Sequence, residues 1–457
     1  MAENAQHLWL KDPLAVHLED HCELEADGGI VVDTASGVIT ELLPSGQQPR
    51  TAVTEIFDAS GHVITPGLVN THHHFYQTLT RAWPPVASSK LFTWLVELYP
   101  VWARLDAEAM RLASQLAMAE LLESGCTTTA DHHYLFPDGG QVTIDTQVEV
   151  AREFGMRAVL TRGSMSVGED DGGLPPRRTV QNEEEILADS RRLVETYHER
   201  RAGAMIQIAL APCSPFSVST ELMARSAALA EELDVRLHTH LAETLDEEEY
   251  CLERFGMRTV DYLESVGWLT DRAWLAHGVH FDDVEIARLG RAGTAVAHCP
   301  SSNMRLASGL ARAVELQDAG SPVGLGVDGS ASNDCSNMIR EVRQALFAQR
   351  LRYGAETVTT QRALDWATKG SAAVLGRHDI GTIAPGKQAD LALFRPDGLA
   401  FSGAHDPLTA LVLCGAERAD RVMVAGQWRV LDGHVVGLDT EALIARHSAA
   451  ARRLVAG

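Results

Sequence analysis

The chain of 457 residues, with 45% hydrophobic and 22% charged residues, is long enough to bury a large core and has the composition of a globular protein. Its formal net charge of −23, without a run of five or six basic residues, argues against a nucleic-acid polymer as a partner. No apolar stretch reaches the roughly 20 residues that span a bilayer, and seven scattered cysteines without a CxxC pair indicate free thiols, so we expect a cytoplasmic protein with no membrane contact.

Both ends of the chain have the pattern of short β-strands separated by turns. Residues 1–62 are expected to form a meander, and residues 384–457 are expected to add further strands and a closing helix over 439–456. The expected strands cover 28–33, 37–43, 53–58, 389–394, 421–426 and 428–431. Two β-rich flanks around one long middle section predict a small β-sandwich domain built from both termini.

The middle section, residues 63–383, alternates strand and helix patterns. The eight expected strands cover 63–70, 127–132, 156–162, 205–212, 235–241, 273–277, 294–298 and 322–328. The expected helices cover 104–124, 140–154, 182–201, 219–233, 246–266, 282–292, 308–319, 335–353 and 360–375. Eight strand–helix units predict an α/β fold with a (β/α)8 barrel of the TIM type. A doubly wound sheet is the alternative, but no glycine-rich phosphate loop follows the first strand.

Polar side chains stand at the ends of these strands, where catalytic residues of such barrels gather. His72 and His74 follow the first strand and share one face by alternation. His240, His277 and Asp328 end the fifth, sixth and eighth strands. The imidazoles of His72, His74 and His240 with the Asp328 carboxylate suit Zn²⁺, with Fe²⁺ as the alternative.

We expect one divalent ion, because a carboxylated lysine that could bridge two ions is missing from the barrel strands. The four lysines of the chain all lie outside strands two to eight. Four further histidines are expected to fill the barrel or to lie behind the ligands: His132, His133, His238 and His298.

A water bound to such an ion would have a pKa of about 7. Glu243, three residues after His240, is the candidate that carries a proton from this water to a leaving group. His277 would orient the water, and Asp328 would also accept its proton. Each residue alone has an ordinary explanation, such as a core histidine or a helix cap. Their combination at strand ends predicts a hydrolytic metal site.

These motifs resemble those of the amidohydrolase superfamily over essentially the whole chain. They are Pro66-Gly67-Leu68-Val69-Asn70-Thr71-His72-x-His74, His240-x-x-Glu243, His298-Cys299-Pro300-x-Ser302-Asn303 and Gly326-Val327-Asp328-Gly329. Within the superfamily the chain is similar to the mononuclear aminohydrolases. This resemblance implies hydrolytic deamination of a small heterocyclic base, and we expect a homo-oligomer.

The stretches after the first, fourth and eighth strands are similar to those of deaminases of oxidised purines. The resemblance implies 8-oxoguanine as the substrate, with uric acid and ammonia as products. Gln77 offers a donor and an acceptor to the ring edge, Trp83 a stacking surface, and Cys213 a wall on the far side of the ring. A triazine, S-adenosylhomocysteine or another purine nucleoside is the alternative substrate. A non-catalytic metal-binding barrel is the alternative outside the enzymes.

Overall fold

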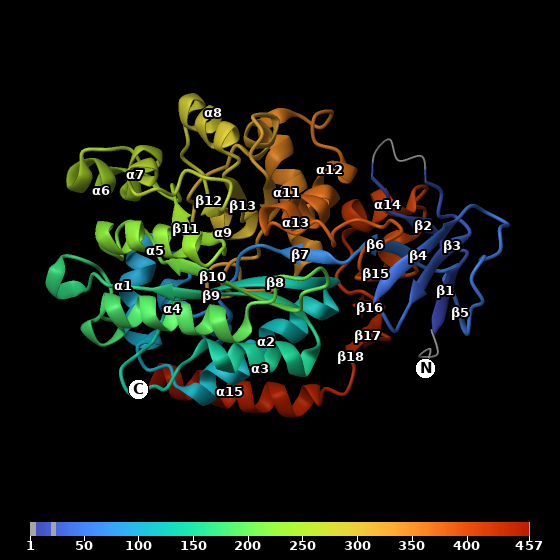
Figure 1. The fold of residues 1–457 in the computed structure, drawn as a ribbon, viewed down its shortest axis with the longest axis horizontal. Helices are drawn as coiled ribbons and strands as arrows, with labels where there is room; N and C mark the ends of the chain where they lie inside the picture. Colours follow the sequence, from blue (N-terminus) through green and yellow to red (C-terminus); the bar gives the residue numbers. More distant parts are fainter. Residues whose placement is uncertain (1–5, 20–23, 457) are drawn as a thin grey trace.

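The computed structural model describes residues 6–19 and 24–456. Its larger part is a barrel of parallel strands surrounded by helices, and its smaller part is a pair of β-sheets at one end of the molecule (Figure 1). None of the helices in these described ranges is long and apolar enough to cross a membrane.

The eight barrel strands lie in chain order, each paired in parallel with the next. They are β7 (Leu68–Asn70), β8 (Cys126–His133), β9 (Arg157–Ser164), β10 (Ile206–Pro212), β11 (Leu237–Leu241), β12 (Ala273–His277), β13 (Ala295–His298) and β14 (Val323–Leu325). The first and last strands meet through a hydrogen bond of 2.9 Å from Thr71 N–H to Leu325 O. The predicted (β/α)8 barrel is therefore confirmed.

The apolar run expected as one strand over 63–70 is in fact two strands that belong to different sheets. β6 (Val63–Pro66) pairs with strands of the smaller part, and β7 enters the barrel. Gly67 separates them, and a Cβ atom there would lie 2.1 Å from Thr127 Oγ1. Only glycine lets the chain pass this close to β8. Both strands are fully buried, which is why the run looks continuous in the sequence.

Helices surround the barrel and cover its strands (Figure 1). They include α1 (Leu91–Trp102), α2 (Ala107–Glu123), α3 (Ile144–Phe154), α4 (Glu183–Tyr197), α5 (Thr220–Glu232), α6 (Leu245–Phe255), α7 (Thr259–Ser265), α8 (Asp283–Ala292), α9 (Pro300–Arg305), α10 (Ala313–Asp318), α11 (Met338–Tyr353), α12 (Thr360–Asp365) and α13 (Ser371–Val374), and the short 3-10 helices η1 (Phe75–Thr80) and η2 (Pro84–Val86). The helix expected over 246–266 is broken into α6 and α7, because Gly256 in the left-handed region ends α6. α1 was not expected.

The smaller part consists of two sheets that share one buried core, which contains Leu8, Ile30, Leu391 and Met423. The four-stranded sheet, in the order β4–β3–β1–β5, uses β1 (His7–Lys11), β3 (Gly29–Asp33), β4 (Val38–Leu43) and β5 (Glu55–Asp58). The six-stranded sheet, in the order β18–β17–β16–β15–β6–β2, uses β6 with β2 (Ala15–Val16), β15 (Leu391–Phe394), β16 (Arg421–Val424), β17 (Gln427–Leu431) and β18 (His434–Val435).

The N-terminal meander predicted from the sequence is wrong. β1 was not expected, and it lies between β3 and β5, pairing antiparallel with the first and parallel with the second. Two strands, β3 and β1, therefore separate β5 from β4. The sequence does not predict β1, because the few residues before it contain no turn signal that would mark the start of a strand.

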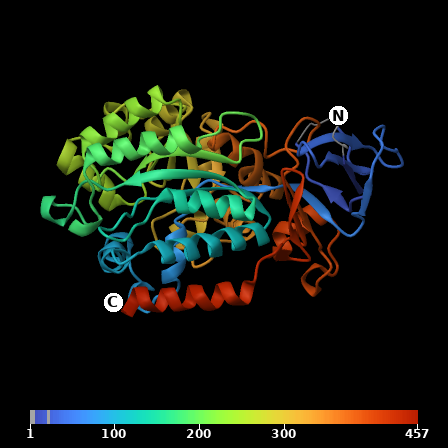
Figure 2. The same ribbon diagram turned by 60° about the horizontal axis from the view of Figure 1, so that its bottom comes forward.

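The contacts that join the sheets to the barrel include a buried ion pair and the packing of the last helix. Arg157 on β9 pairs with Asp390 at 2.6 Å between Nε and Oδ2, and the two side chains are 0% and 2% exposed. After the last strand, α15 (Thr440–Ala456) runs back along α2 on the outside of the barrel (Figure 2).

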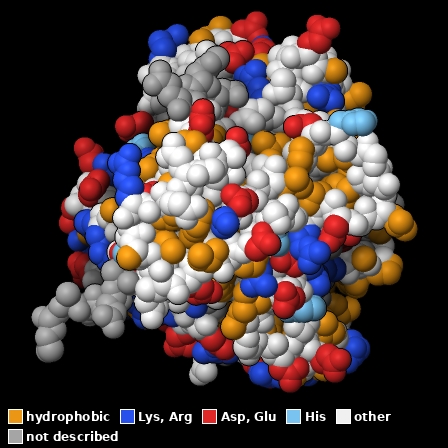
Figure 3. Space-filling view, turned by 90° about the vertical axis from the view of Figure 1, so that its right-hand side faces the viewer, with side chains coloured by type: hydrophobic (Ala, Val, Ile, Leu, Met, Phe, Trp, Pro, Cys, Tyr) orange, Lys and Arg blue, Asp and Glu red, His pale blue; other side chains and the backbone are white. Residues whose placement is uncertain are grey.

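On the face of the molecule at the side of the small sheets, acidic and basic side chains are interspersed (Figure 3).

Candidate active site

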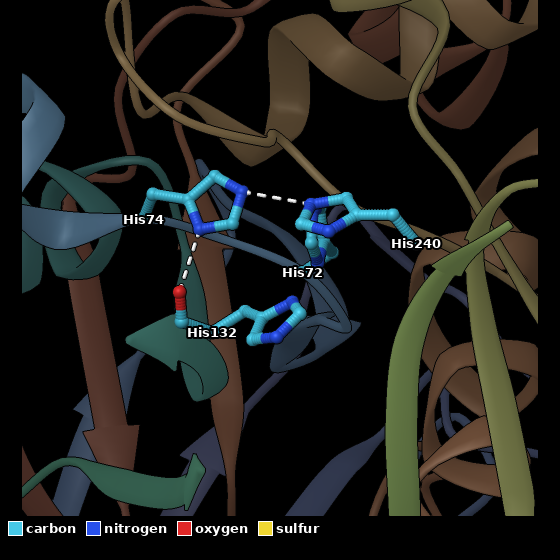
Figure 4. Close-up of side chains that lie close together, drawn as sticks. All are labelled: His72, His74, His132 and His240. Carbon is cyan, nitrogen blue, oxygen red and sulfur yellow. Dashed lines mark hydrogen bonds between the residues drawn. The ribbon is translucent and has the colours of Figure 1, made fainter. Parts of the chain in front are cut away.

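The predicted metal ligands come together at the carboxyl ends of the barrel strands. The Nε2 atoms of His74 and His240 lie 3.1 Å apart and point toward one another (Figure 4). Asp328 Oδ1 lies 3.3 Å from Nε2 of both His72 and His74. His72, His74 and Asp328 are buried, and His240 is nearly so. The strands therefore place three imidazoles and one carboxylate around one point.

Hydrogen bonds fix which nitrogen of each imidazole faces this point. His74 Nδ1 donates to the backbone oxygen of His132 at 2.7 Å, and His240 Nδ1 donates to that of Cys213 at 2.7 Å. Because a carbonyl oxygen can only accept, both Nδ1 atoms carry the proton and both Nε2 atoms present a lone pair. His72 Nε2 is buried without a hydrogen-bond partner among the described residues. The donor set fits one divalent ion such as Zn²⁺.

The charge states also suit metal binding. Burial lowers the pKa values of His72 and His74, and it lowers that of His240 to about 3, so all three imidazoles are neutral near pH 7. Burial alone would raise the pKa of Asp328, but the neighbouring imidazoles of His72 and His277 hold it well below its usual range. Neutral histidines and an ionised carboxylate are the forms that bind a metal.

The backbone is strained where Asp328 and His277 leave their strands. Their φ angles are +61° and +73°, in the left-handed region that residues other than glycine rarely adopt. The Asp328 carboxylate accepts hydrogen bonds from Gly329 N–H at 2.7 Å and from Ser332 Oγ at 3.1 Å. These contacts hold the strained residue in place, as is typical of functional sites.

Glu243 and His277 lie next to each other, beside the predicted metal ligands. Glu243 Oε2 lies 3.5 Å from His277 Nε2, which lies 3.9 Å from Asp328 Oδ2. Burial raises the pKa of Glu243 to about 7, so its carboxyl group can both accept and release a proton near neutral pH. Asn303 Oδ1 accepts from His277 Nδ1 at 2.9 Å, and buried Glu247 accepts from the backbone N–H of Glu243 at 2.9 Å.

Next to these groups is a cavity with about 400 Å³ of space not filled by protein atoms, part of which is open to solvent. Much of its wall is apolar or aromatic, and the polar groups of the site open into it. The lining residues are His74, Gln77, Leu91, Trp94, Leu95, Tyr99, Tyr134, Cys213, Phe216, His240, Glu243, His277, Leu306, Asp328 and Ser332.

Of the three side chains predicted to contact the substrate, Gln77 and Cys213 line this cavity and Trp83 does not. Trp83 immediately precedes η2 and packs against the outer side of the main core. Trp94 on α1 lines the cavity in its place. The sequence did not predict Trp94 because α1 was not expected. The only feature that could have indicated this residue was a tryptophan within an apolar stretch.

His132 at the end of β8 also belongs to the histidine cluster. It joins His72, His74 and His240 in a group whose candidate ligand atoms all lie within 4.8 Å of one another. Its Nε2 donates to Ala211 O at 3.0 Å, and its ring stacks on that of His240. Its Nδ1 is buried without a partner among the described residues. The Asp-His-His run that ends the second barrel strand was the available signal for it.

Comparison with known proteins identifies the family. The Amidohydrolase family model matches residues 63–429. The 8-oxoguanine deaminase of Pseudomonas aeruginosa is 66% identical over 449 residues, which are 98% of this chain and 99% of that protein. Isoxanthopterin deaminase from an unknown prokaryotic organism is 36% identical over 86% of both chains. The crystal structure of atrazine chlorohydrolase from Arthrobacter aurescens TC1 complexed with zinc superposes with a TM-score of 0.92, at 33% identity, covering 97% of this chain and 100% of that one. The resemblance predicted from the motifs is confirmed: the chain belongs to the amidohydrolase family.

Proposed function

We propose that this protein hydrolyses 8-oxoguanine at the ring carbon that bears the exocyclic amine, giving uric acid and ammonia. The observation that supports 8-oxoguanine as the substrate is the 66% identity to an 8-oxoguanine deaminase over 98% of the chain. The geometry supports the class of reaction, because a buried carboxyl group stands beside a histidine and a set of metal ligands in one cavity.

The chain's own residues account for the proton transfers of such a reaction. When bound, a divalent ion lowers the pKa of a coordinated water to about 7 and so supplies the nucleophile. Glu243 is placed to accept a proton from the attacking water as the C–O bond forms, and to pass that proton to the amine nitrogen as the C–N bond breaks and ammonia leaves. His277, held by Asn303, orients the water. Asp328 would hold the ion through one carboxylate oxygen and could accept a proton on the other.

The cavity favours a free base over S-adenosylhomocysteine. That alternative substrate carries a carboxylate, which needs a cationic partner when it is buried. In the described part of the chain, no lysine or arginine lines the cavity. Gln77 Oε1 accepts from Ala331 N–H at 3.3 Å, which leaves the amide N–H groups of Gln77 to donate to a carbonyl oxygen of the base.

Cys213 bears on the choice between 8-oxoguanine and guanine. Burial raises the pKa of its thiol to about 12, so it remains a neutral, weak donor. An 8-oxopurine carries a proton on N7, whereas guanine presents a lone pair there. A wall without a strong donor therefore suits the oxidised base. In a site that aims a donor at N7, pairing that donor with the N7–H of 8-oxoguanine would cost about 1–3 kcal/mol, or roughly 5- to 150-fold in affinity, and this wall avoids that cost.

The experiment is a comparison of kcat/KM for ammonia release from 8-oxoguanine, guanine, isocytosine, S-adenosylhomocysteine and a triazine, each with and without a chelator. We expect 8-oxoguanine to have the highest value and guanine a lower one. If S-adenosylhomocysteine or the triazine is better by more than tenfold, the proposed substrate is wrong while the deaminase chemistry stands. Ammonia release that a chelator leaves unchanged would contradict the metal-dependent mechanism.

A further inference from the structure

A second histidine lies directly behind one of the predicted ligands. His238 precedes His240 by two residues on β11, and its side chain is fully buried. Its Nε2 lies 2.8 Å from His72 Nδ1, and its Nδ1 lies 2.8 Å from the backbone oxygen of Trp274. Its ring stacks on the Trp274 indole with 4.3 Å between centroids and 11° between planes.

These two contacts determine where the protons are. The oxygen of Trp274 can only accept, so His238 carries its proton on Nδ1. A neutral imidazole has one such proton, so His238 Nε2 has a lone pair and accepts a hydrogen bond from His72. His72 therefore carries its proton on Nδ1 and presents the lone pair of Nε2, the atom 3.3 Å from Asp328 Oδ1.

His72 differs in this respect from the other two imidazole ligands. The Nδ1 protons of His74 and His240 are held by backbone oxygens, which no side-chain substitution removes. The Nδ1 proton of His72 is held by a side chain. The tautomer of His72 therefore depends on the identity of residue 238.

We propose that His238 is a positioning residue that fixes the tautomer and orientation of His72 and thereby sets the affinity of the site for its divalent ion. Without an acceptor at this position, the Nδ1 proton of His72 is buried without a partner or moves to Nε2, where a lone pair is required. Loss of the hydrogen-bond partner behind a metal ligand typically lowers metal affinity by about 10- to 100-fold. This inference concerns the metal site and is independent of which base is the substrate.

The test uses three substitutions that separate the acceptor from the shape of the side chain. His238→Gln places an amide oxygen where Nε2 was and can still accept from His72. His238→Asn is too short to reach His72 but can still donate to the oxygen of Trp274. His238→Phe keeps the stacking on the indole and removes both hydrogen bonds. His62→Asn is the matched control, because His62 is a buried histidine beside the small sheets, bonded to Asp420.

The readout is the dissociation constant of Zn²⁺ from the full-length protein, measured by competition with a chromophoric chelator, with thermal melting of the metal-free proteins alongside. We expect the glutamine variant and the control to bind zinc like the wild type, and the asparagine and phenylalanine variants to bind about 10- to 100-fold more weakly. Wild-type affinity in the latter two would overturn the proposal. Equal losses in all three substitutions would also overturn it, because the acceptor would then not be the decisive feature.

A second measurement keeps the proposal testable if a variant does not fold. In the wild-type protein with ¹⁵N-labelled histidine, two-bond nitrogen–proton correlations report the tautomer of each ring. We expect both His72 and His238 to carry the proton on Nδ1, with and without metal. A proton on Nε2 of His72 in the metal-free protein would contradict the proposed arrangement.

Discussion

Replacement of Glu243 by glutamine tests the centre of the proposed chemistry. The substitution keeps the size of a side chain that is 6% exposed and removes its ability to transfer a proton. Since burial brings the pKa of Glu243 to about 7, the group is matched to neutral pH, where general acid–base catalysis is most effective. Such groups contribute about 10²- to 10⁴-fold, which corresponds to roughly 2.7–5.4 kcal/mol of activation free energy.

The assay is steady-state ammonia release together with metal analysis of the same preparation. We expect kcat to fall by at least about 100-fold with the metal content unchanged, because the Glu243 carboxylate contacts His277 and is not one of the predicted ligands. Glu253→Gln, at an exposed position of helix α6, which begins two residues after Glu243, is the control and should retain the wild-type rate. A near-wild-type rate in Glu243→Gln would remove Glu243 from the mechanism.

The pH dependence of kcat/KM is an independent test of the role of Glu243. The carboxylate form of Glu243 accepts the proton, and its fraction falls as pH decreases through about 7. We therefore expect kcat/KM of the wild type to decrease on the acidic side of neutrality. In Glu243→Gln the residual activity should lack this acidic limb. The same limb in the variant would mean that another group controls it.

Three further changes address the metal, the cavity and the stability of the fold. Removal of the metal with a chelator should abolish ammonia release, and one equivalent of Zn²⁺ per chain should restore it; two tightly bound ions by elemental analysis would contradict a mononuclear site. Gln77→Leu removes a buried donor and should lower kcat/KM for 8-oxoguanine by roughly 5- to 150-fold, equivalent to about 1–3 kcal/mol; an unchanged value would exclude Gln77 from substrate recognition. Arg157→Ala leaves the buried Asp390 carboxylate without its partner and should lower the free energy of unfolding by about 3–5 kcal/mol, measured by urea denaturation; a loss below about 1 kcal/mol would show that the pair is not needed to hold the sheets on the barrel.

The meeting of the four predicted metal ligands could be worked out from the sequence because their positions follow from two regular features of the chain. Alternation along a strand puts His72 and His74 on one side, and the barrel brings all strand ends to one rim. His240 and Asp328 needed no further information, since His240 lies in the last two residues of β11 and Asp328 follows three residues after β14. The division of the run before His72 into β6 and β7 could not be predicted, because it depends on the contact between Gly67 and Thr127, which are distant in sequence.

The cavity wall was much harder to predict than the ligands. Trp83 and Trp94 both lie within 20 residues after His74, and the sequence does not show which of them faces the cavity. Their placement depends on how η1 and η2 turn and on where α1 begins, and Lys90 precedes α1 without a side-chain cap. Loop conformation of this kind is set by tertiary packing, so no periodic pattern reports it.

Reaction type and substrate choice therefore lie in different parts of this fold. The proton-transfer group and the ligands stand on strand ends whose geometry the barrel fixes, so a short motif is enough to predict the chemistry. The side chains that meet the ring come from segments that follow the strands, such as Gln77 on η1 and Trp94 on α1, and these segments can change without disturbing the barrel. This explains why relatives at 33–36% identity match over most of the chain while their names describe different heterocycles. It also explains why the proposed substrate depends on identity over the whole chain, whereas the deamination chemistry depends on a few residues.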